Sequence, residues 1–349
     1  MDKFLIINWG LIGDVISSTP LFEEIKSSFK DTHLTVITKP YSYPILQYNP
    51  YIDKIHILPK KEYIYEKILN RFSLFTFYKE LLFCKYDYCI DLIGNTRSAF
   101  LSLLSKAKLK IGLYKKKHLR NIIYDKFVFL HNLSPHLSSK INEFLKTLNI
   151  KSRNLYPRIY LREEEIQRVK RLFSDVSDKR LKIGIFPGAG WHAKMWPLFY
   201  FRNIVDKFES PEIEFYLLLG PRESKEFVIS CKGLFPDITL IENIDLRETV
   251  AFIKQLDLLI TNDTGPLHIS RAVNTPVIGL FGPTCPDVVE LDKDSVGISG
   301  YYNCPYLDRK KGDINPCLNT FCKDPQCIKS ITVAEVENAL RIFISKMGG

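Results

Sequence analysis

Short apolar runs alternate with longer amphipathic segments along most of this chain. Runs that are apolar throughout are typical of strands buried on both faces of a parallel sheet. The runs we interpret as strands are Phe4–Ile7, Leu34–Thr38, Ile55–Leu58, Tyr88–Leu92, Leu181–Phe186, Ile213–Leu219, Ile238–Ile241, Leu258–Ile260 and Val277–Phe281. Helical spacing of apolar residues marks Pro20–Phe29, Tyr63–Phe83, Glu163–Phe173, Pro197–Phe208 and Leu246–Leu256. The alternation predicts the α/β fold class, with parallel sheets covered by helices.

The pattern is interrupted once, in the polar and proline-containing segment 151–161, and then restarts. A chain of 349 residues is long enough for two domains of ordinary size. We therefore predict two doubly wound domains, over residues 1–155 and 163–330. Ligands of such folds bind at the carboxyl ends of the strands, where the strand order reverses.

The composition is that of a globular protein, with 46% hydrophobic and 25% charged residues. No apolar run approaches the ~18 residues that a membrane-spanning helix needs. The apolar run near the N-terminus is too short for a signal peptide, and no small-residue cleavage site follows it. These features predict a cytoplasmic protein.

Positive charge is concentrated in Ser105–Arg120, within a chain whose net charge is +10. This segment contains Lys115, Lys116 and Lys117 and no acidic residue. Such a segment fits the phosphates of a lipid head group, a phosphorylated glycan or a nucleic acid, and it equally fits a solvated loop. No nucleic-acid-binding motif accompanies it, so we expect no nucleic-acid partner.

Four of the eight cysteines, Cys304, Cys317, Cys322 and Cys327, lie close together in the sequence. Their spacing lacks the paired C-x2-C turns of a zinc ribbon. A metal site and a disulfide remain open, but we favour free thiols, because reduced cysteines are usual in a cytoplasmic chain.

A glycine-containing turn, Asn8–Pro20, follows the first apolar run and carries one acid, Asp14. From the residues alone, Asp14 fits a helix cap, a phosphate-binding loop or a catalytic carboxylate.

The segment "TNDTGPLHISRA", which begins at Thr261, follows another apolar run. Pro266 suits the first turn of a helix, and the free N–H groups near Thr264 and Gly265 would then favour an anion such as a diphosphate. Capping by Asp263 or Thr264 is the simpler reading, but an Asp, a Thr and His268 together exceed what capping requires. We favour a binding function.

Two further strand ends carry candidate ligand-binding residues. In "FPGAGWHAKMWP", from Phe186, glycines allow close backbone approach and Lys194 can neutralise a diphosphate, unless it is only a solvated lysine. Glu223 follows the strand ending at Leu219, where an acid can bind ribose hydroxyls, although on its own this segment is more simply interpreted as a polar loop. Walker and G-x-G-x-x-G motifs are absent from these loops, so we expect no dinucleotide cofactor.

Together these segments resemble the ADP-heptose:lipopolysaccharide heptosyltransferases, glycosyltransferase family 9. The similar stretches are "GLIGDVISSTP", "FPGAGWHAKMWP", "LLLGPRE", "NDTGPLHISRAVNTPVIGLFGPT" and the cysteine-rich tail, in family order over about residues 3–343. The resemblance implies the GT-B architecture, two Rossmann-like domains facing a cleft. The first would bind the acceptor and the second the nucleotide sugar. Residues 331–349 would form a helix that packs back on the N-terminal domain.

The resemblance also assigns roles to residues. Asp14 would be the general base of an inverting, metal-independent transfer that needs no cofactor. The donor-binding residues would be Lys194, Glu223, Asp263, Thr264, Gly265 and His268, and the acceptor-binding residues would be Gly13, Lys115, Lys116 and Lys117. Met195 stands where the family usually has a basic residue.

The implied reaction moves heptose from ADP-heptose to an acidic, lipid-linked core glycan at the inner face of the inner membrane, with the protein peripheral there. Two alternatives remain: another family 9 transferase with a different nucleotide sugar or acceptor, and a non-catalytic nucleotide-sugar binding module.

Overall fold

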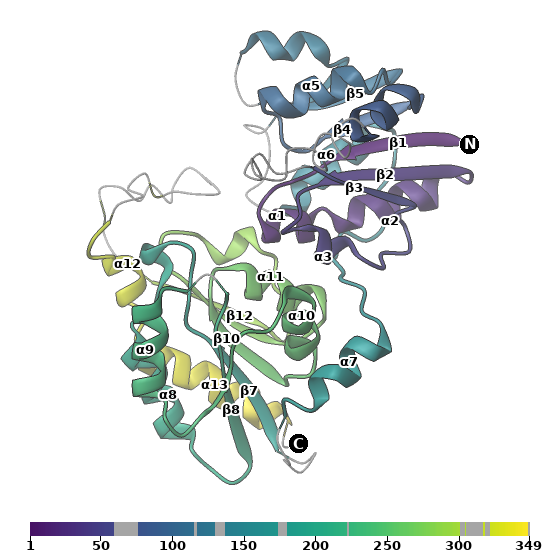
Figure 1. The fold of residues 1–349 in the computed structure, drawn as a ribbon. Helices are drawn as coiled ribbons and strands as arrows, with labels where there is room; N and C mark the ends of the chain where they lie inside the picture. The colour runs from purple at the N-terminus through teal and green to yellow at the C-terminus, as the bar shows by residue number, and fades with distance from the viewer. Residues whose placement is uncertain are drawn as a thin grey trace. The chain divides into compact units, whose positions relative to one another are not determined.

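A computed structural model describes residues 1–58, 76–114, 117–129, 137–173, 180–221, 223–300, 304, 317 and 322–347. The chain forms two compact units, Met1–Tyr160 and Leu161–Gly349, each with its own parallel sheet (Figure 1). The division lies within segment 151–161, where the apolar pattern is interrupted. Each unit is described by itself.

The first unit is a six-stranded sheet in the order β3-β2-β1-β4-β5-β6, and every pairing between its described strands is parallel. Its strands are β1 (Asp2–Ile7), β2 (Thr32–Thr38), β3 (Lys54–Ile57), β4 (Tyr88–Asp91), β5 (Leu109–Tyr114) and β6 (Lys126–Phe129). Its helices are α1 (Ile12–Ser17), α2 (Thr19–Ser28), α3 (Tyr43–Leu46), a helix over residues 76–83, α5 (Thr96–Leu104), the 3-10 turn η1 (Leu119–Ile123) and α6 (Leu137–Thr147).

Alternation along β1 explains how the first sheet is covered on both faces. Leu5 and Ile7 point to one face, where they pack with Leu81 of helix 76–83 and Leu101 of α5. Phe4 points to the other face and contacts Phe29 at the end of α2. Because both faces of β1 are buried, the strand is apolar without interruption.

The second unit repeats this arrangement in the order β12-β11-β10-β7-β8-β9. Its strands are β7 (Leu181–Phe186), β8 (Ile213–Leu218), β9 (Thr239–Ile241), β10 (Leu258–Asn262), β11 (Val277–Phe281) and β12 (Val296–Ser299). Its helices are α7 (Glu163–Lys170), α8 (Leu198–Phe208), α9 (Lys225–Leu234), α10 (Leu246–Lys254), α11 (Gly265–Ala272), α12 (Gln326–Lys329) and α13 (Val333–Met347), with 3-10 turns η3 (His192–Lys194) and η4 (Pro286–Val288). Helices α8 and α9 cover one face, and α10 and α11 the other (Figure 1).

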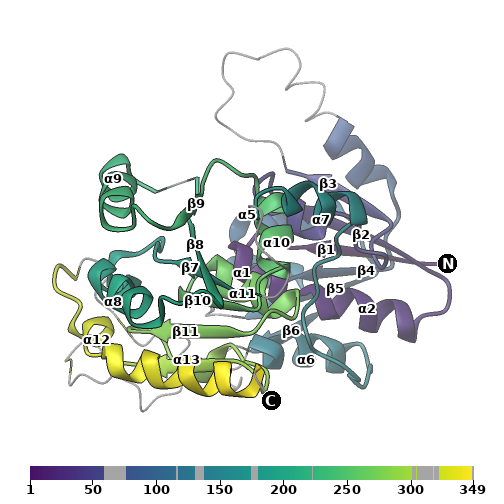
Figure 2. The same cartoon turned by 90° about the horizontal axis from the view of Figure 1, so that it is seen from below.

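The C-terminal helix α13 packs within the second unit. Val336, Leu340 and Phe343 are buried in the core that α8 and the sheet also form, and α13 runs alongside β11 (Figure 2). The apolar face of α13 covers β11 and β12 of its own unit. That this helix also packs back on the N-terminal domain stays a prediction.

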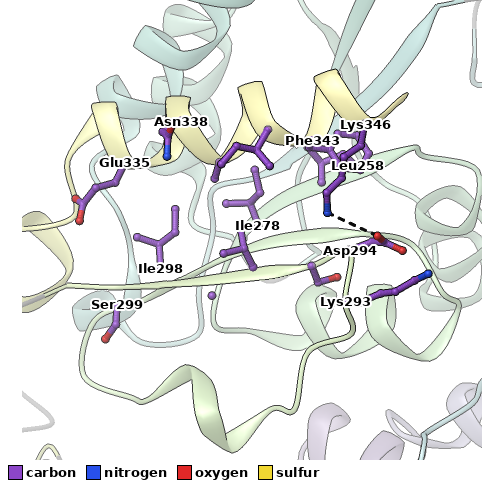
Figure 3. A pocket seen from close by; sticks show the side chains of 15 residues that line it. Leu258, Ile278, Lys293, Asp294, Ile298, Ser299, Glu335, Asn338, Phe343 and Lys346 are labelled. Carbon is purple, nitrogen blue, oxygen red and sulfur yellow. Dashed lines mark ion pairs between the residues drawn. The ribbon is translucent and has the colours of Figure 1, made fainter. Parts of the chain in front are cut away.

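A groove separates part of α13 from the edge strand β12 (Figure 3). Ile278 and Ile298 line it from the sheet, and Lys346 pairs with Asp294 at 3.9 Å at one end. Its lining includes Leu258, the first residue of β10, and all of β12 from Val296 to Ser299, so the groove runs along the edge strand.

Both strand orders follow the doubly wound pattern 3-2-1-4-5-6 of Rossmann folds, which confirms the predicted fold class. All nine predicted strands are present, and their ends differ from the predicted ones by at most two residues. Strands β5, β6 and β12 were not predicted, and β5 lies inside the basic segment. Of the helix predicted over Tyr63–Phe83, residues 76–83 are helical, and the rest falls outside the described part of the chain.

Candidate active site

Asp14, Lys194 and Asp263 lie at the switch points of the two sheets. In the first sheet the strand order reverses between β1 and β4, and Asp14 follows β1. In the second sheet it reverses between β7 and β10; Lys194 follows β7 and Asp263 follows β10. Ligands of open α/β sheets bind outside the carboxyl ends of strands at such points.

Asp14 lies in the first turn of α1, and its side chain is exposed. Its Oδ2 accepts a hydrogen bond of 3.0 Å from the N–H of Leu11, the residue that precedes the helix. A Cβ on Gly10 would lie 2.6 Å from the Asp14 Cβ, so only glycine lets the carboxylate fold back over the turn. Asp14 therefore does cap the helix, and one carboxylate oxygen, Oδ1, is not used for this.

Side-chain hydrogen bonds hold the turn before Asp14 in place. The Tyr41 hydroxyl donates to the carbonyls of Trp9 and Gly10, at 3.0 and 2.9 Å. The buried Asn8 amide donates to the Ser18 hydroxyl at 2.7 Å. The loop that follows β2 and the start of α2 thus both hold the turn that positions Asp14.

Lys194, Asp263 and Thr284 come together from three strand ends of the second sheet. The Lys194 ammonium donates to Asp263 Oδ2 at 2.5 Å, and the Thr284 hydroxyl donates to the same oxygen at 2.6 Å. The Lys194 side chain retains 20% of its exposure, while that of Asp263 retains 9%. An ammonium has three N–H donors, so Lys194 keeps donors for a ligand.

The environment of Asp263 favours its ionised form. Burial pushes the pKa of this carboxyl upward, but the charges of Lys194 and His268 and the hydrogen bonds from Lys194 and Thr284 outweigh that effect and hold the pKa below its usual value. The carboxylate is therefore negative at neutral pH and fixes the ammonium of Lys194 at the strand ends.

Helix α11 begins directly after Asp263. Thr264 is its N-cap residue, but the Thr264 hydroxyl donates back to the carbonyl of Asn262, at 3.3 Å, rather than capping the helix. Gly265 and Pro266 form the first turn, and His268 lies one turn further on, partly exposed. The positive end of the helix dipole thus adjoins the Lys194 ammonium, a combination that suits an anion.

Asn262, which was not predicted as a site residue, joins two of these loops. Its side chain is fully buried; its amide donates to the carbonyl of Pro187 at 2.7 Å and accepts from the N–H of Trp196 at 3.0 Å. These bonds hold both ends of the loop that carries Lys194. The sequence feature that could have identified Asn262 was an amide side chain at the end of an apolar run, at the start of "NDTGP".

Glu223 reaches the same loop from the end of β8. A Cβ on Gly188 would lie 2.1 Å from Glu223 Oε1, so the carboxylate lies against the backbone of Gly188. Burial raises the pKa of Glu223. Glu223 and Lys194 therefore border the loop that joins Gly188 to Trp196.

The proposed acceptor-binding residues are all in the first unit. Gly13 is buried in α1, next to Asp14. Lys117 is exposed after β5, which is two strands from β1 in the sheet. Lys115 and Lys116 lie outside the described residues. Part of the basic segment is not a loop: Lys110 lies in β5 and pairs with Asp125 at 3.5 Å.

The eight cysteines are free thiols, and burial raises the pKa of Cys327 to about 11. Within the described ranges, His, Cys, Asp and Glu side chains form no group of three or more suited to a metal ion. None of the described helices is both long and apolar enough to span a membrane.

Comparison with known proteins gives relatives over most of the chain. Lipopolysaccharide heptosyltransferase 1 of Campylobacter coli is 28% identical over 301 residues, which are 81% of this chain and 84% of that protein. Lipopolysaccharide heptosyltransferase 3 of Escherichia coli is 29% identical over 283 residues, 78% of this chain and 81% of that protein.

A solved structure and a family model agree with these relatives. The structure of E. coli ADP-heptose lps heptosyltransferase II superimposes with a TM-score of 0.76 at 18% identity, covering 99% of this chain and all of that one, and it has the same GT-B fold. The model of glycosyltransferase family 9 (heptosyltransferase) matches residues 74–319, well over half of the chain. With two Rossmann-like sheets and this match, the chain is a glycosyltransferase that belongs to family 9.

Proposed function

We propose that this protein transfers heptose from ADP-heptose to the inner core of lipopolysaccharide, with inversion at the anomeric carbon and with Asp14 as general base. The observation that carries the proposal is the Lys194–Asp263 pair beside the start of α11, at the switch point of the second sheet. That arrangement is suited to a diphosphate, the group that leaves in this reaction.

On the donor side, the bond from the anomeric carbon to the diphosphate breaks, and its electron pair stays on the diphosphate oxygen. Lys194 and the first N–H groups of α11 stabilise that charge. Because Asp263, Thr284 and Asn262 already hold these groups in place, little reorganisation is needed during the reaction. Glu223, against Gly188, is assigned to the ribose hydroxyls of the nucleotide.

On the acceptor side, a sugar hydroxyl is a weak nucleophile at neutral pH. The Asp14 carboxylate removes its proton while the hydroxyl oxygen bonds to the anomeric carbon. Asp14 is exposed and fixed by one hydrogen bond to the Leu11 N–H, so one of its oxygens can accept that proton. Gly13 and the basic segment, including Lys117, are assigned to the acceptor.

The donor and acceptor follow from the relatives. The names of the C. coli and E. coli proteins state that they are lipopolysaccharide heptosyltransferases, and one name includes ADP-heptose. We propose the same donor and acceptor for this chain. Because such an acceptor is attached to a lipid, we also propose that the protein acts at a membrane surface.

A nucleotide panel tests the donor assignment. The melting temperature of the full chain is measured with ADP, ADP-heptose, UDP, GDP and CMP. A ligand at 100 times its Kd stabilises a protein by about 2.7 kcal/mol, so a specific nucleotide raises the melting temperature by roughly several degrees. We expect this with ADP and ADP-heptose only.

Transfer is then followed by mass spectrometry of heptose-free lipopolysaccharide incubated with ADP-heptose. Addition of one heptose supports the proposal. Stabilisation by UDP or GDP instead of ADP would overturn the donor, and ADP-heptose binding without any transfer would favour a non-catalytic module.

A further inference from the structure

Two neighbouring elements of the first unit expose apolar side chains to solvent. On α5, Phe100 and Leu103 remain 51% and 50% exposed; on η1, Leu119 and Ile122 remain 79% and 80% exposed. Helix α5 and the turn η1 contact each other, so the two pairs belong to one region of the surface. We name these four residues the apolar patch.

The spacing within each pair puts the side chains on one face. Phe100 and Leu103 are three residues apart on an α-helix, and Leu119 and Ile122 are three apart on a 3-10 turn, where such positions eclipse. Turn η1 has the sequence Leu-Arg-Asn-Ile-Ile and contains no buried residue. Its apolar side chains are therefore not part of the core of the unit.

Positive charge is concentrated in the sequence segments that carry the apolar patch. Between residues 92 and 124 the chain has eight Lys and Arg residues and no Asp or Glu. Among them, Lys117 and Arg120 flank Leu119, and Arg97 lies one turn before Phe100 on α5. Of the eight, Lys108 pairs with Asp87 and Lys110 pairs with Asp125.

We propose that the apolar patch and its basic rim dock the first unit onto an anionic lipid bilayer. Apolar side chains at the tip of a basic surface enter the boundary between head groups and acyl chains, while the lysines and arginines meet lipid phosphates. A protein partner would leave the excess of positive charge unmatched, unless it were strongly acidic. The docking extends the proposed function, because it brings the chain to a lipid-borne acceptor.

The test is co-sedimentation of the full chain with large vesicles, without donor, lipopolysaccharide or other glycan. One set contains phosphatidylethanolamine and phosphatidylglycerol, and the other only phosphatidylcholine. We expect binding to the anionic set and a weaker partition at high salt. Because no sugar is transferred, failure here is separate from failure of the transferase assignment.

Variants separate insertion from charge attraction. Leu119→Gln with Ile122→Gln should lower the vesicle partition coefficient by roughly tenfold or more, since apolar surface no longer leaves water. Lys117→Glu with Arg120→Glu should lower it by at least about fivefold for each charge removed. The matched control is Phe199→Gln with Ile229→Gln, which are 54% and 69% exposed on α8 and α9 of the second unit and should change nothing.

Three results would overturn the proposal. The first is no binding to anionic vesicles. The second is unchanged binding of the Leu119/Ile122 variant, which would show attraction by charge alone. The third is a wild-type dimer in sedimentation velocity that the Leu119/Ile122 variant no longer forms, while the variant still binds vesicles. That result would show that the apolar patch is a protein interface.

Discussion

Lys194 and Asp263 form an ion pair across the switch point of the second sheet, with 2.5 Å between Nζ and Oδ2. The pair joins the loop after β7 to the strand end of β10. Since the Asp263 side chain is almost fully buried, it needs a cation nearby, and that cation also faces the proposed diphosphate site.

Replacing Lys194 by Met tests this double role. We expect kcat to fall by about 10²–10³-fold, because a fixed charge on the leaving group is lost. The unpaired Asp263 should also lower the free energy of unfolding by about 1–3 kcal/mol. Steady-state kinetics and urea unfolding measure the two effects.

Lys254→Met is the matched control, because Lys254 is exposed at the end of α10. It should keep both activity and stability. If Lys194→Met retained full kcat, the lysine would serve only to neutralise Asp263.

Asp14→Asn separates capping from catalysis. An amide oxygen can still accept the hydrogen bond from the Leu11 N–H, so the melting temperature should change little. An amide cannot take a proton from a hydroxyl, so kcat/KM should fall by roughly 10²–10⁴-fold, with ADP binding unchanged in titration calorimetry.

Asp245→Asn provides the comparison, since Asp245 caps α10 through a 2.8 Å hydrogen bond from the Glu248 N–H and has no assigned chemistry. Both variants should have similar stability, and only Asp14→Asn should lose turnover. If Asp14→Asn retained turnover, Asp14 would serve only to cap the helix.

Much of this site could be predicted because it follows buried strands. Runs such as Leu258–Ile260 are apolar on both faces, so the sequence marks where each strand ends and the polar loop begins. Asp14, Lys194 and Asp263 are the first charged residues after β1, β7 and β10. Their positions could therefore be predicted without knowledge of which strands are neighbours in the sheet.

Other parts depend on tertiary contacts and could not be read in this way. Strand β5 was hidden because Lys110, which looks solvated in the sequence, lies within the strand and pairs with Asp125 in the fold. Thr284 gained a role only because β11 lies beside β10, which brings its hydroxyl to Asp263. Register and strand order determine such contacts, and local periodicity does not contain them.

The raised pKa of Glu223 predicts a pH-dependent stability. Burial makes its ionised form less favourable in the folded chain than in the unfolded chain, so stability is lost as pH rises from about 4.5 through the folded pKa. Glu223→Gln removes this cost. We expect the variant to melt at a higher temperature than the wild type at pH 8 and at the same temperature at pH 4.

Glu226 on the adjoining first turn of α9 supplies the control, because hydrogen bonds from its own N–H and from Ser224 lower its pKa. Glu226→Gln should therefore give no stabilisation at pH 8. A stabilisation by Glu223→Gln that is equal at pH 4 and pH 8 would exclude ionisation as its cause.

Gly188 and Gly190 offer a paired test of the ribose contact. A Cβ at position 188 would lie 2.1 Å from Glu223 Oε1, whereas a Cβ at position 190 would meet no atom within 4 Å. Glu223 can swing away, so Gly188→Ala should cost little stability but should displace the carboxylate. Losing a hydrogen bond to a charged group weakens ADP binding by roughly tenfold or more. Titration calorimetry should show this for Gly188→Ala and unchanged affinity for Gly190→Ala; equal affinities would remove Glu223 from the nucleotide site.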